Sequence, residues 1–379
     1  MVKQAKHFRH SSKKIGVLWD TLLGLPGKRG QSRVYRPEQA EATLQAVQTA
    51  LRELGYQVQL VPVSENLLAD LTRSDLDLVF NLAAGACSRS WQAHVVAQLE
   101  MSQVPFTGSG LTTHVLALNK HVAKQIFRAV GVPTPASQVL GIVTTPVSNL
   151  PFGLSFPVIV KPVSEGSSIG IWSDSVVTNL KELRAAVRRL TDQLDEPVLI
   201  EEYIEGREFT VGILGNDRLT CLPVEEIIFP SGFYDYQVKK KDAVDTVCPA
   251  EIPPGLAQSI QEMCRKVYRV MGCRGYARFD LRLDRENRPY LLEVNTLPGL
   301  QPGYSELPRM AAAAGMSFRE LVGTIVTLGF EYFAKVKARS LSKKAAGMKP
   351  EGASLPGSLT PDPRWLLSAK GKGRPGRQV

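Results

Sequence analysis

Short apolar runs alternate with amphipathic stretches in the first third of the chain. The run Lys13–Trp19 predicts a buried strand, and a glycine-rich loop separates it from a helix that begins at Pro37 and ends at Gly55. The pattern then predicts one helix, Trp91–Met101, and three short strands, Gln57–Val61, Leu76–Asn81 and Val104–Thr107. Such alternation predicts a parallel sheet covered by helices.

The pattern changes in the rest of the chain, where strands follow one another more often. A long helix is predicted over Thr112–Val130 and is terminated by Gly131 and Pro133. The further strands are 156–162, Val198–Glu202, Glu208–Leu214, Gly275–Leu283 and Pro289–Asn295, and the further helices are Thr178–Leu190, Leu256–Met271 and Phe318–Phe333. This mixture predicts an α+β region. The chain after Lys335 is rich in Lys, Gly, Pro and Ser, which predicts a disordered tail.

The composition is that of a globular protein. The 379 residues suffice for two or three domains, and an apolar fraction of 44% is ordinary. The sequence contains no charge-free apolar run of about 18 residues, as a membrane span requires. The basic N-terminus lacks the apolar core and the small-residue cleavage site of a secretory signal, so none is predicted. The five cysteines form no C-x-x-C pair, which predicts buried or idle thiols in a reducing cytoplasm rather than a zinc or redox site.

The net charge of +10 is concentrated at the two ends of the chain. Residues 1–14 carry five basic residues and no acid, and residues 335–379 carry eleven basic and two acidic residues. The intervening residues 15–334 therefore have a net charge of −4. A basic tail can contact nucleic acid or anionic lipid, but an acidic body argues against a nucleic-acid-binding protein.

The hairpin sequence ARFDLRLDRENRPYLLEVNTLPG carries the strongest chemical signal. Two strands flank a polar turn, whose centre is taken as the middle of the R-E-N-R run. This register places Asp280 opposite Glu293 and Arg278 opposite Asn295. All four side chains then lie on one face of the sheet, because residues two apart on a strand point the same way.

Two carboxylates directly opposite each other repel, and a bound cation removes that penalty. Carboxylate and amide oxygens suit Mg²⁺, which takes its remaining ligands from water and substrate phosphates. The hairpin therefore predicts a magnesium site. The alternative is a solvated outer face on which Arg278 screens the acids.

Three further motifs favour nucleotide binding. Lys161 ends an apolar strand and precedes a Gly/Ser loop, in KPVSEGSSIG, whose backbone N–H groups can surround phosphate oxygens. The strand and turn EEYIEGRE can form the wall of an adenine pocket, with Glu208 accepting from ribose hydroxyls. The lysines of FYDYQVKKK can neutralise a transferring phosphate. Each of these motifs alone is also explained as an exposed turn or loop.

In this order and spacing, the motifs resemble those of the D-alanine–D-alanine ligases, from about Lys14 to about Phe330. The resemblance implies an N-terminal α/β domain at 15–117 with a parallel sheet, then a two-lobed ATP-grasp domain at 118–334. The two lobes of the ATP-grasp domain span about 118–205 and 206–334. Basic segments at 1–14 and 335–379 precede and follow the two domains.

The resemblance also implies a cytoplasmic ligase that forms an acyl phosphate and then a peptide-type bond in cell-wall precursor synthesis. The implied cofactors are ATP and two Mg²⁺ ions, with Mn²⁺ as an alternative. The implied partners are small amino acids, with no nucleic acid and no membrane span, and a homodimer is left open.

Individual residues take roles from the same resemblance. The contacts to ATP phosphates fall to Lys120, Lys161, Ser167, Ser168 and Lys239. The adenine and ribose contacts fall to Glu201, Tyr203, Ile204 and Glu208. The metal ligands are Asp280, Glu293 and Asn295. The oxyanion is stabilised by Arg278 and the backbone of Gly299. The substrates and the loops over them are held by Glu38, Ser167, Tyr236 and Ser305.

The departures from the family pattern gather at the amino-acid sites. The first substrate loop is longer than usual and reads DTLLGLPGKRGQSRVYRPE, with Glu38 at the position of the family glutamate. The family His-Gly pair is Ala84-Gly85, and Asn119 and Lys240 replace an aspartate and a tyrosine. The segment between Gly299 and Ser305 is one residue longer. ATP use is therefore better supported than specificity for D-alanine.

Two alternatives to this ligase stay open. The same chemistry can act on another substrate pair, such as a different D-amino acid or a hydroxy acid acceptor. A nucleotide-binding protein with reduced catalysis would keep the core while its substrate loops drift. Retention of Lys239, Arg278 and the three metal ligands argues against the second alternative.

Overall fold

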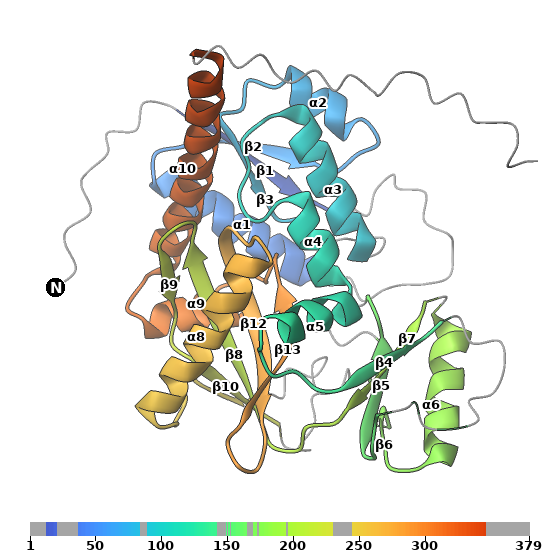
Figure 1. The fold of residues 1–379 in the computed structure, drawn as a ribbon. Helices are drawn as coiled ribbons and strands as arrows, with labels where there is room; N and C mark the ends of the chain where they lie inside the picture. Colours follow the sequence, from blue (N-terminus) through green and yellow to red (C-terminus); the bar gives the residue numbers. More distant parts are fainter. Residues whose placement is uncertain are drawn as a thin grey trace, which may run out of the picture. The chain divides into compact units, whose positions relative to one another are not determined.

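The computed structural model describes residues 13–20, 37–83, 89–141, 149, 151, 153–164, 170–172, 174–194, 196–229 and 245–345. The strands within these ranges form three sheets (Figure 1). The chain divides into two units after Tyr332, inside the helix α10 (Phe318–Ala345).

The N-terminal sheet is parallel. Its strands, in the order β2-β1-β3, are β1 (Lys14–Trp19), β2 (Gln57–Pro62) and β3 (Leu78–Asn81). The helices of this part are α1 (Pro37–Glu53), α2 (Leu67–Arg73) and α3 (Arg89–Ser102). The predicted parallel sheet with helices is therefore confirmed. The predicted strand Val104–Thr107 is wrong, because this segment contributes a single bridge, between Phe106 and Val79.

The predicted helix Thr112–Val130 is two helices, α4 (Leu111–Leu118) and α5 (Lys120–Ala129). The break occurs at Asn119, whose backbone is extended and whose side chain caps α5 by accepting from the Val122 N–H at 3.0 Å. Both helices have buried residues close to Asn119, so the apolar periodicity of the sequence continues across the break. Prediction from periodicity alone therefore missed it.

A four-stranded antiparallel sheet follows, in the order β4-β7-β5-β6. Its strands are β4 (Ser137–Leu140), β5 (Val158–Pro162), β6 (Val176–Val177) and β7 (Val198–Glu202). The helix α6 (Leu180–Gln193) covers one face of this sheet with Leu183, Ala186, Val187 and Leu190, spaced as one helical stripe (Figure 1).

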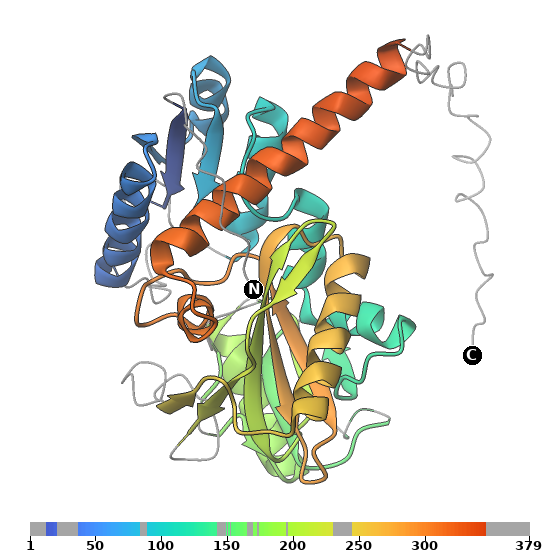
Figure 2. The same cartoon turned by 90° about the vertical axis from the view of Figure 1, so that its left-hand side faces the viewer.

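The third sheet is antiparallel and carries the hairpin. Its strands are β8 (Arg207–Gly215), β9 (Leu219–Cys221), β10 (Glu225–Ile228), β11 (Asp245–Val247), β12 (Gly275–Leu283) and β13 (Pro289–Asn295). The main path is β11-β10-β8-β12-β13, with β9 beside β8. The helix α8 (Pro254–Val270) runs along this sheet (Figure 2). A short helix, α9 (Glu306–Ala313), follows β13.

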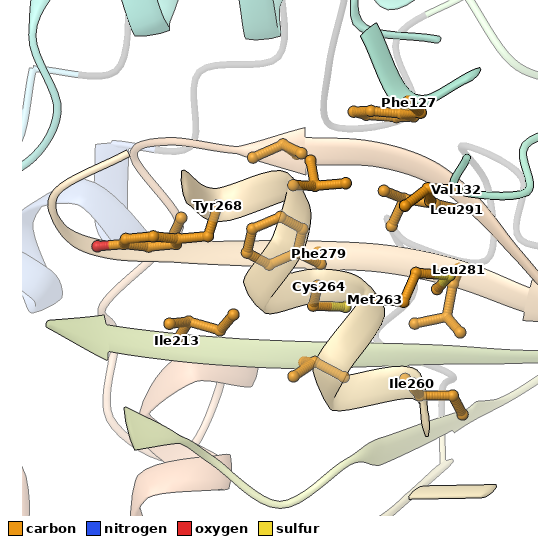
Figure 3. Packing of buried hydrophobic residues seen from close by; sticks show 14 of the residues in the cluster. Phe127, Val132, Ile213, Ile260, Met263, Cys264, Tyr268, Phe279, Leu281 and Leu291 are labelled. Carbon is orange, nitrogen blue, oxygen red and sulfur yellow. The ribbon is translucent and has the colours of Figure 1, made fainter. Parts of the chain in front are cut away.

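The core between α8 and this sheet is apolar (Figure 3). Met263, Cys264 and Tyr268 of α8 pack with Phe279 of β12, and Phe127 of α5 belongs to the same cluster. Cys264 is thus a buried thiol, as predicted for the cysteines. Cys87 lies outside the described residues.

The hairpin of β12 and β13 contains a β-bulge. Asp280 pairs with Glu293, as predicted, but one step further Leu281 pairs with Leu291, which leaves Leu292 unpaired. The turn is therefore centred on the glutamate of the R-E-N-R run, half a residue before its predicted centre. Without the bulge, Asp280 would pair with Leu292 and the two carboxylates would point to opposite faces.

Several elements were not predicted, namely α2, α9, β4, β6, β9, β10 and β11. The strands among them have two to four residues, too few to show an alternating pattern. The last helix was predicted to end at Phe333 but continues to Ala345, so the tail predicted from Lys335 begins as helix. Alanine, lysine, leucine and arginine in this extension favour the helix. The predicted domain boundaries stay predictions.

Candidate active site

The third sheet has one apolar face and one face that carries charged residues. The residues buried on the apolar side are Phe209, Val211, Ile213, Phe279, Leu281 and Leu283. The alternate positions of β8 and β12 must point the other way. These positions carry Glu208, Thr210, Arg278, Asp280 and Arg282, while Leu214 and Tyr276 at the same spacing belong to another apolar cluster. Period-two alternation thus places every charged residue of the predicted hairpin site on a single face.

Asp280 is the centre of a hydrogen-bond network on this face. Arg278 donates to both of its carboxylate oxygens, at 2.9 and 2.7 Å. Thr210 donates to one oxygen at 2.8 Å and Asn295 to the other at 2.7 Å. The carboxylate is held in one orientation by three side chains from three strands.

Glu293 lies beside this network. Its Oε2 is 3.0 Å from Lys120 Nζ, and Asn295 Nδ2 lies 3.3 Å from its Oε1. Because the same Asn295 nitrogen also donates to Asp280, the three predicted metal ligands lie within hydrogen-bond distance of one another. The described residues contain no group of three or more His, Cys, Asp or Glu side chains that could hold a metal ion. The oxygens of two carboxylates and of an amide nevertheless fit Mg²⁺, which takes further ligands from substrate phosphates.

Arg278 bridges two carboxylates. Its NH1 donates to Glu306 Oε2 at 2.8 Å, in addition to its two bonds to Asp280. Burial opposes the charge, but the two carboxylates hold the pKa of Arg278 well above its usual value. The guanidinium is therefore permanently charged and fixed in direction, as a group that stabilises negative charge requires.

Gly299 and Ser305 are adjacent in space. A Cβ on Gly299 would lie 2.7 Å from Ser305 Oγ, so the close approach requires glycine. Ser305 Oγ accepts from the Gln301 N–H at 3.1 Å and closes the loop before α9. Glu306, the partner of Arg278, follows directly in the first turn of that helix.

A second charged cluster lies at the four-stranded sheet. Lys161 of β5 donates to Glu201 Oε1 of β7 at 2.8 Å, and Lys124 of α5 lies 2.9 Å from Glu201 Oε2. Burial alone would raise the pKa of Glu201, but the two lysine charges and their hydrogen bonds lower it below its usual value. Glu201 is therefore ionised and buried, with 2% of its side chain exposed.

Arg282 organises the predicted adenine wall. Its guanidinium donates to the carbonyls of Ile204 and Gly206 at 2.8 and 2.7 Å and to Glu208 at 2.9 Å. It also lies over the Tyr203 ring, 5.1 Å from the centroid. Burial raises the pKa of Glu208, and the charge of Arg282 opposes that effect only in part. The single side chain of Arg282 therefore connects β12 to the segment from Ile204 to Glu208 through three residues of that segment.

Gly206 is required at this turn. Its φ is +149°, and a Cβ would lie 2.0 Å from the Leu283 carbonyl oxygen. We expect Gly206→Ala to destabilise the protein by more than about 2 kcal/mol and to weaken ATP binding, measured by thermal unfolding and calorimetry. Gly255→Ala is the control, since its Cβ would meet no atom within 4 Å. Equal melting temperatures for the two variants would contradict this role of Gly206.

Some predicted residues lie outside the described part, namely Ser167, Ser168, Tyr236 and Lys239. The side chain of Glu38 is also outside it, although Glu38 falls in the first turn of α1 as expected. Sequence reasoning missed four residues of the three clusters described above: Lys124, Thr210, Arg282 and Glu306. Only Lys124 and Arg282 left a signal, as charges within the buried pattern of α5 and β12.

A sheet with a charged face and a smaller sheet that carries a buried lysine form the arrangement of an ATP-grasp ligase. Solved structures with this fold include a D-alanine–D-alanine ligase of Bacillus anthracis complexed with ATP, with a TM-score of 0.67 at 24% identity over 86% of this chain and 99% of that one. The VanG D-Ala:D-Ser ligase of Enterococcus faecalis has a TM-score of 0.66 at 24% identity, over 84% and 100% of the two chains.

The sequence comparisons identify the family. The D-alanine–D-alanine ligase of Bordetella avium is 36% identical over 305 residues, which are 79% of this chain and 94% of the relative. A family described as D-ala D-ala ligase C-terminus matches residues 126–327. The chain belongs to the D-alanine–D-alanine ligase family, and the predicted resemblance is confirmed. No helix within the described ranges has the length and apolar character of a membrane span.

Proposed function

We propose that this protein is an ATP-dependent D-alanine–D-alanine ligase that supplies a dipeptide for cell-wall precursor synthesis. The observation that supports it most strongly is the convergence of Asp280, Glu293 and Asn295 beside Arg278, in a chain of this family. In the proposed reaction, one D-alanine carboxylate takes the γ-phosphoryl group of ATP. The amine of the second D-alanine then displaces phosphate.

Each cluster has a part in this reaction. Lys161 and Glu201 would hold the nucleotide, with Lys161 at the phosphates. When bound at Asp280, Glu293 and Asn295, Mg²⁺ would offset the negative charge of the phosphates. Arg278 would contact the oxygen on which negative charge develops, and its two carboxylate partners hold it there without rearrangement.

The function is tested by phosphate release from MgATP with a panel of amino acids, followed by mass measurement of the product. We expect release with D-alanine and the mass of D-alanyl-D-alanine, and no release with L-alanine. A product only with D-serine or a hydroxy acid would identify another substrate pair. Nucleotide binding without any product would favour a protein with reduced catalysis. The homodimer, the second Mg²⁺ ion and the cytoplasmic location stay predictions.

A further inference from the structure

Lys124 is a fully buried lysine to which the sequence analysis gave no role. It belongs to the buried stripe of α5, where Lys120, Ala123, Lys124 and Phe127 all lie inside. Its side chain has 0% exposure. Burial of a lysine is costly unless the charge is paired. The residue therefore needs an explanation in terms of its partners.

The partners of Lys124 tie three elements together. Its Nζ lies 2.9 Å from Glu201 Oε2 of β7 and donates to Thr134 Oγ1 at 3.0 Å. Thr134 in turn donates to the carbonyl of Leu291 in β13 at 2.7 Å. Burial lowers the pKa of Lys124 to about 8, although Glu201 opposes this effect. The ammonium is therefore still charged at neutral pH.

Within the part of the chain that the structure describes, the cluster contains two cations and one carboxylate. Lys161 pairs with Oε1 of Glu201 and Lys124 pairs with Oε2, so the two lysines share one carboxylate. Among these three side chains, Lys161 has the largest exposed fraction, 8%. The net charge of the group is +1, and Arg128 adds a further positive field at Lys124. An uncompensated buried positive charge is costly, so an anionic ligand would stabilise this group.

We propose that Lys124 is a positioning residue of the nucleotide site. Its positive charge offsets the negative charge of Glu201, so that the positive charge of Lys161 can attract the phosphates of the nucleotide. Without Lys124, the carboxylate and Lys161 form a neutral pair, and Lys161 is held away from an anionic ligand. This inference rests on the proposed ATP site. It adds that the attraction for phosphate is set by a residue that does not touch the nucleotide.

The test compares MgADP with adenosine, which lacks phosphate, by calorimetry on the full chain. For Lys124→Met we expect the dissociation constant of MgADP to rise by about tenfold and that of adenosine to change by less than about threefold. Lys181→Met, at an exposed lysine of α6, is the matched control and should change neither constant.

A double variant separates charge from packing. Lys124→Met with Glu201→Gln restores the net charge of +1, so the preference for MgADP over adenosine should return towards that of the wild type. If Lys124 only supports the fold, both single and double variants lose melting temperature and the preference stays unchanged. An unchanged preference in Lys124→Met overturns the inference. Failure of the wild type to bind MgADP would instead overturn the proposed function.

Discussion

Replacement of Glu293 by glutamine is expected to lower turnover by about a thousandfold or more, because the site loses one of two carboxylates that offset phosphate charge through Mg²⁺. The unliganded fold should survive. Loss of the Glu293 charge relieves repulsion with Asp280 but removes the ion pair with Lys120, which measures 3.0 Å. These effects oppose each other, so the free energy of unfolding should change by less than about 1 kcal/mol. Turnover assays and metal-free thermal melts measure both quantities.

The control for this experiment is Glu286→Gln. Glu286 lies in the turn of the same hairpin with 67% of its side chain exposed, so its loss should affect neither turnover nor stability. If Glu293→Gln retains turnover within a few-fold of the wild type, Glu293 does not belong to the catalytic site. If Glu293→Gln lowers stability strongly while turnover stays normal, the pairing of Asp280 with Glu293 has only a structural role.

Replacement of Arg278 by lysine is expected to reduce kcat by about a hundredfold or more, with a smaller change in the KM for ATP. Lysine keeps the positive charge but lacks the planar fork with which Arg278 binds both oxygens of Asp280 and one oxygen of Glu306. A compact ammonium cannot hold both carboxylates and still face a developing oxyanion. Steady-state kinetics with ATP and D-alanine separate kcat from KM.

Arg285→Lys provides the matched control. Arg285 lies in the turn of the same hairpin, pairs with Glu205 and has 78% of its side chain exposed. Its replacement should leave both kinetic constants unchanged. If Arg278→Lys changes only the melting temperature, the arginine stabilises the hairpin and has no part in the chemistry.

Much of the site was predictable because it depends on local alternation. Arg278, Asp280 and Arg282 alternate with apolar residues along β12, and this period of two determines which side chains share a face. The pairing of Asp280 with Glu293 followed from the length of one hairpin. The family resemblance rests on the same short motifs, so it too was available from the sequence.

The sequence predicted the pairing of Asp280 with Glu293 correctly, but it did not predict the β-bulge on which that pairing depends. The turn centre was misplaced by half a residue, and the extra Leu292 compensates for this. Leu291 and Val294 are both buried although they are three positions apart, which simple alternation forbids. In the sequence, Leu292 and Val294 are two positions apart and fit ordinary alternation, so only the structure shows the bulge.

The remaining contacts were decided by the tertiary structure. Glu306 reaches Arg278 across 28 positions of the chain, and Lys124 reaches Glu201 across 77. A periodic pattern shows only which face of an element is buried, and a lysine in that pattern carries no sign of its partner. The partner depends on how helices and sheets pack, because a buried charge is stable only where a distant part of the chain brings its counter-charge within a few ångströms.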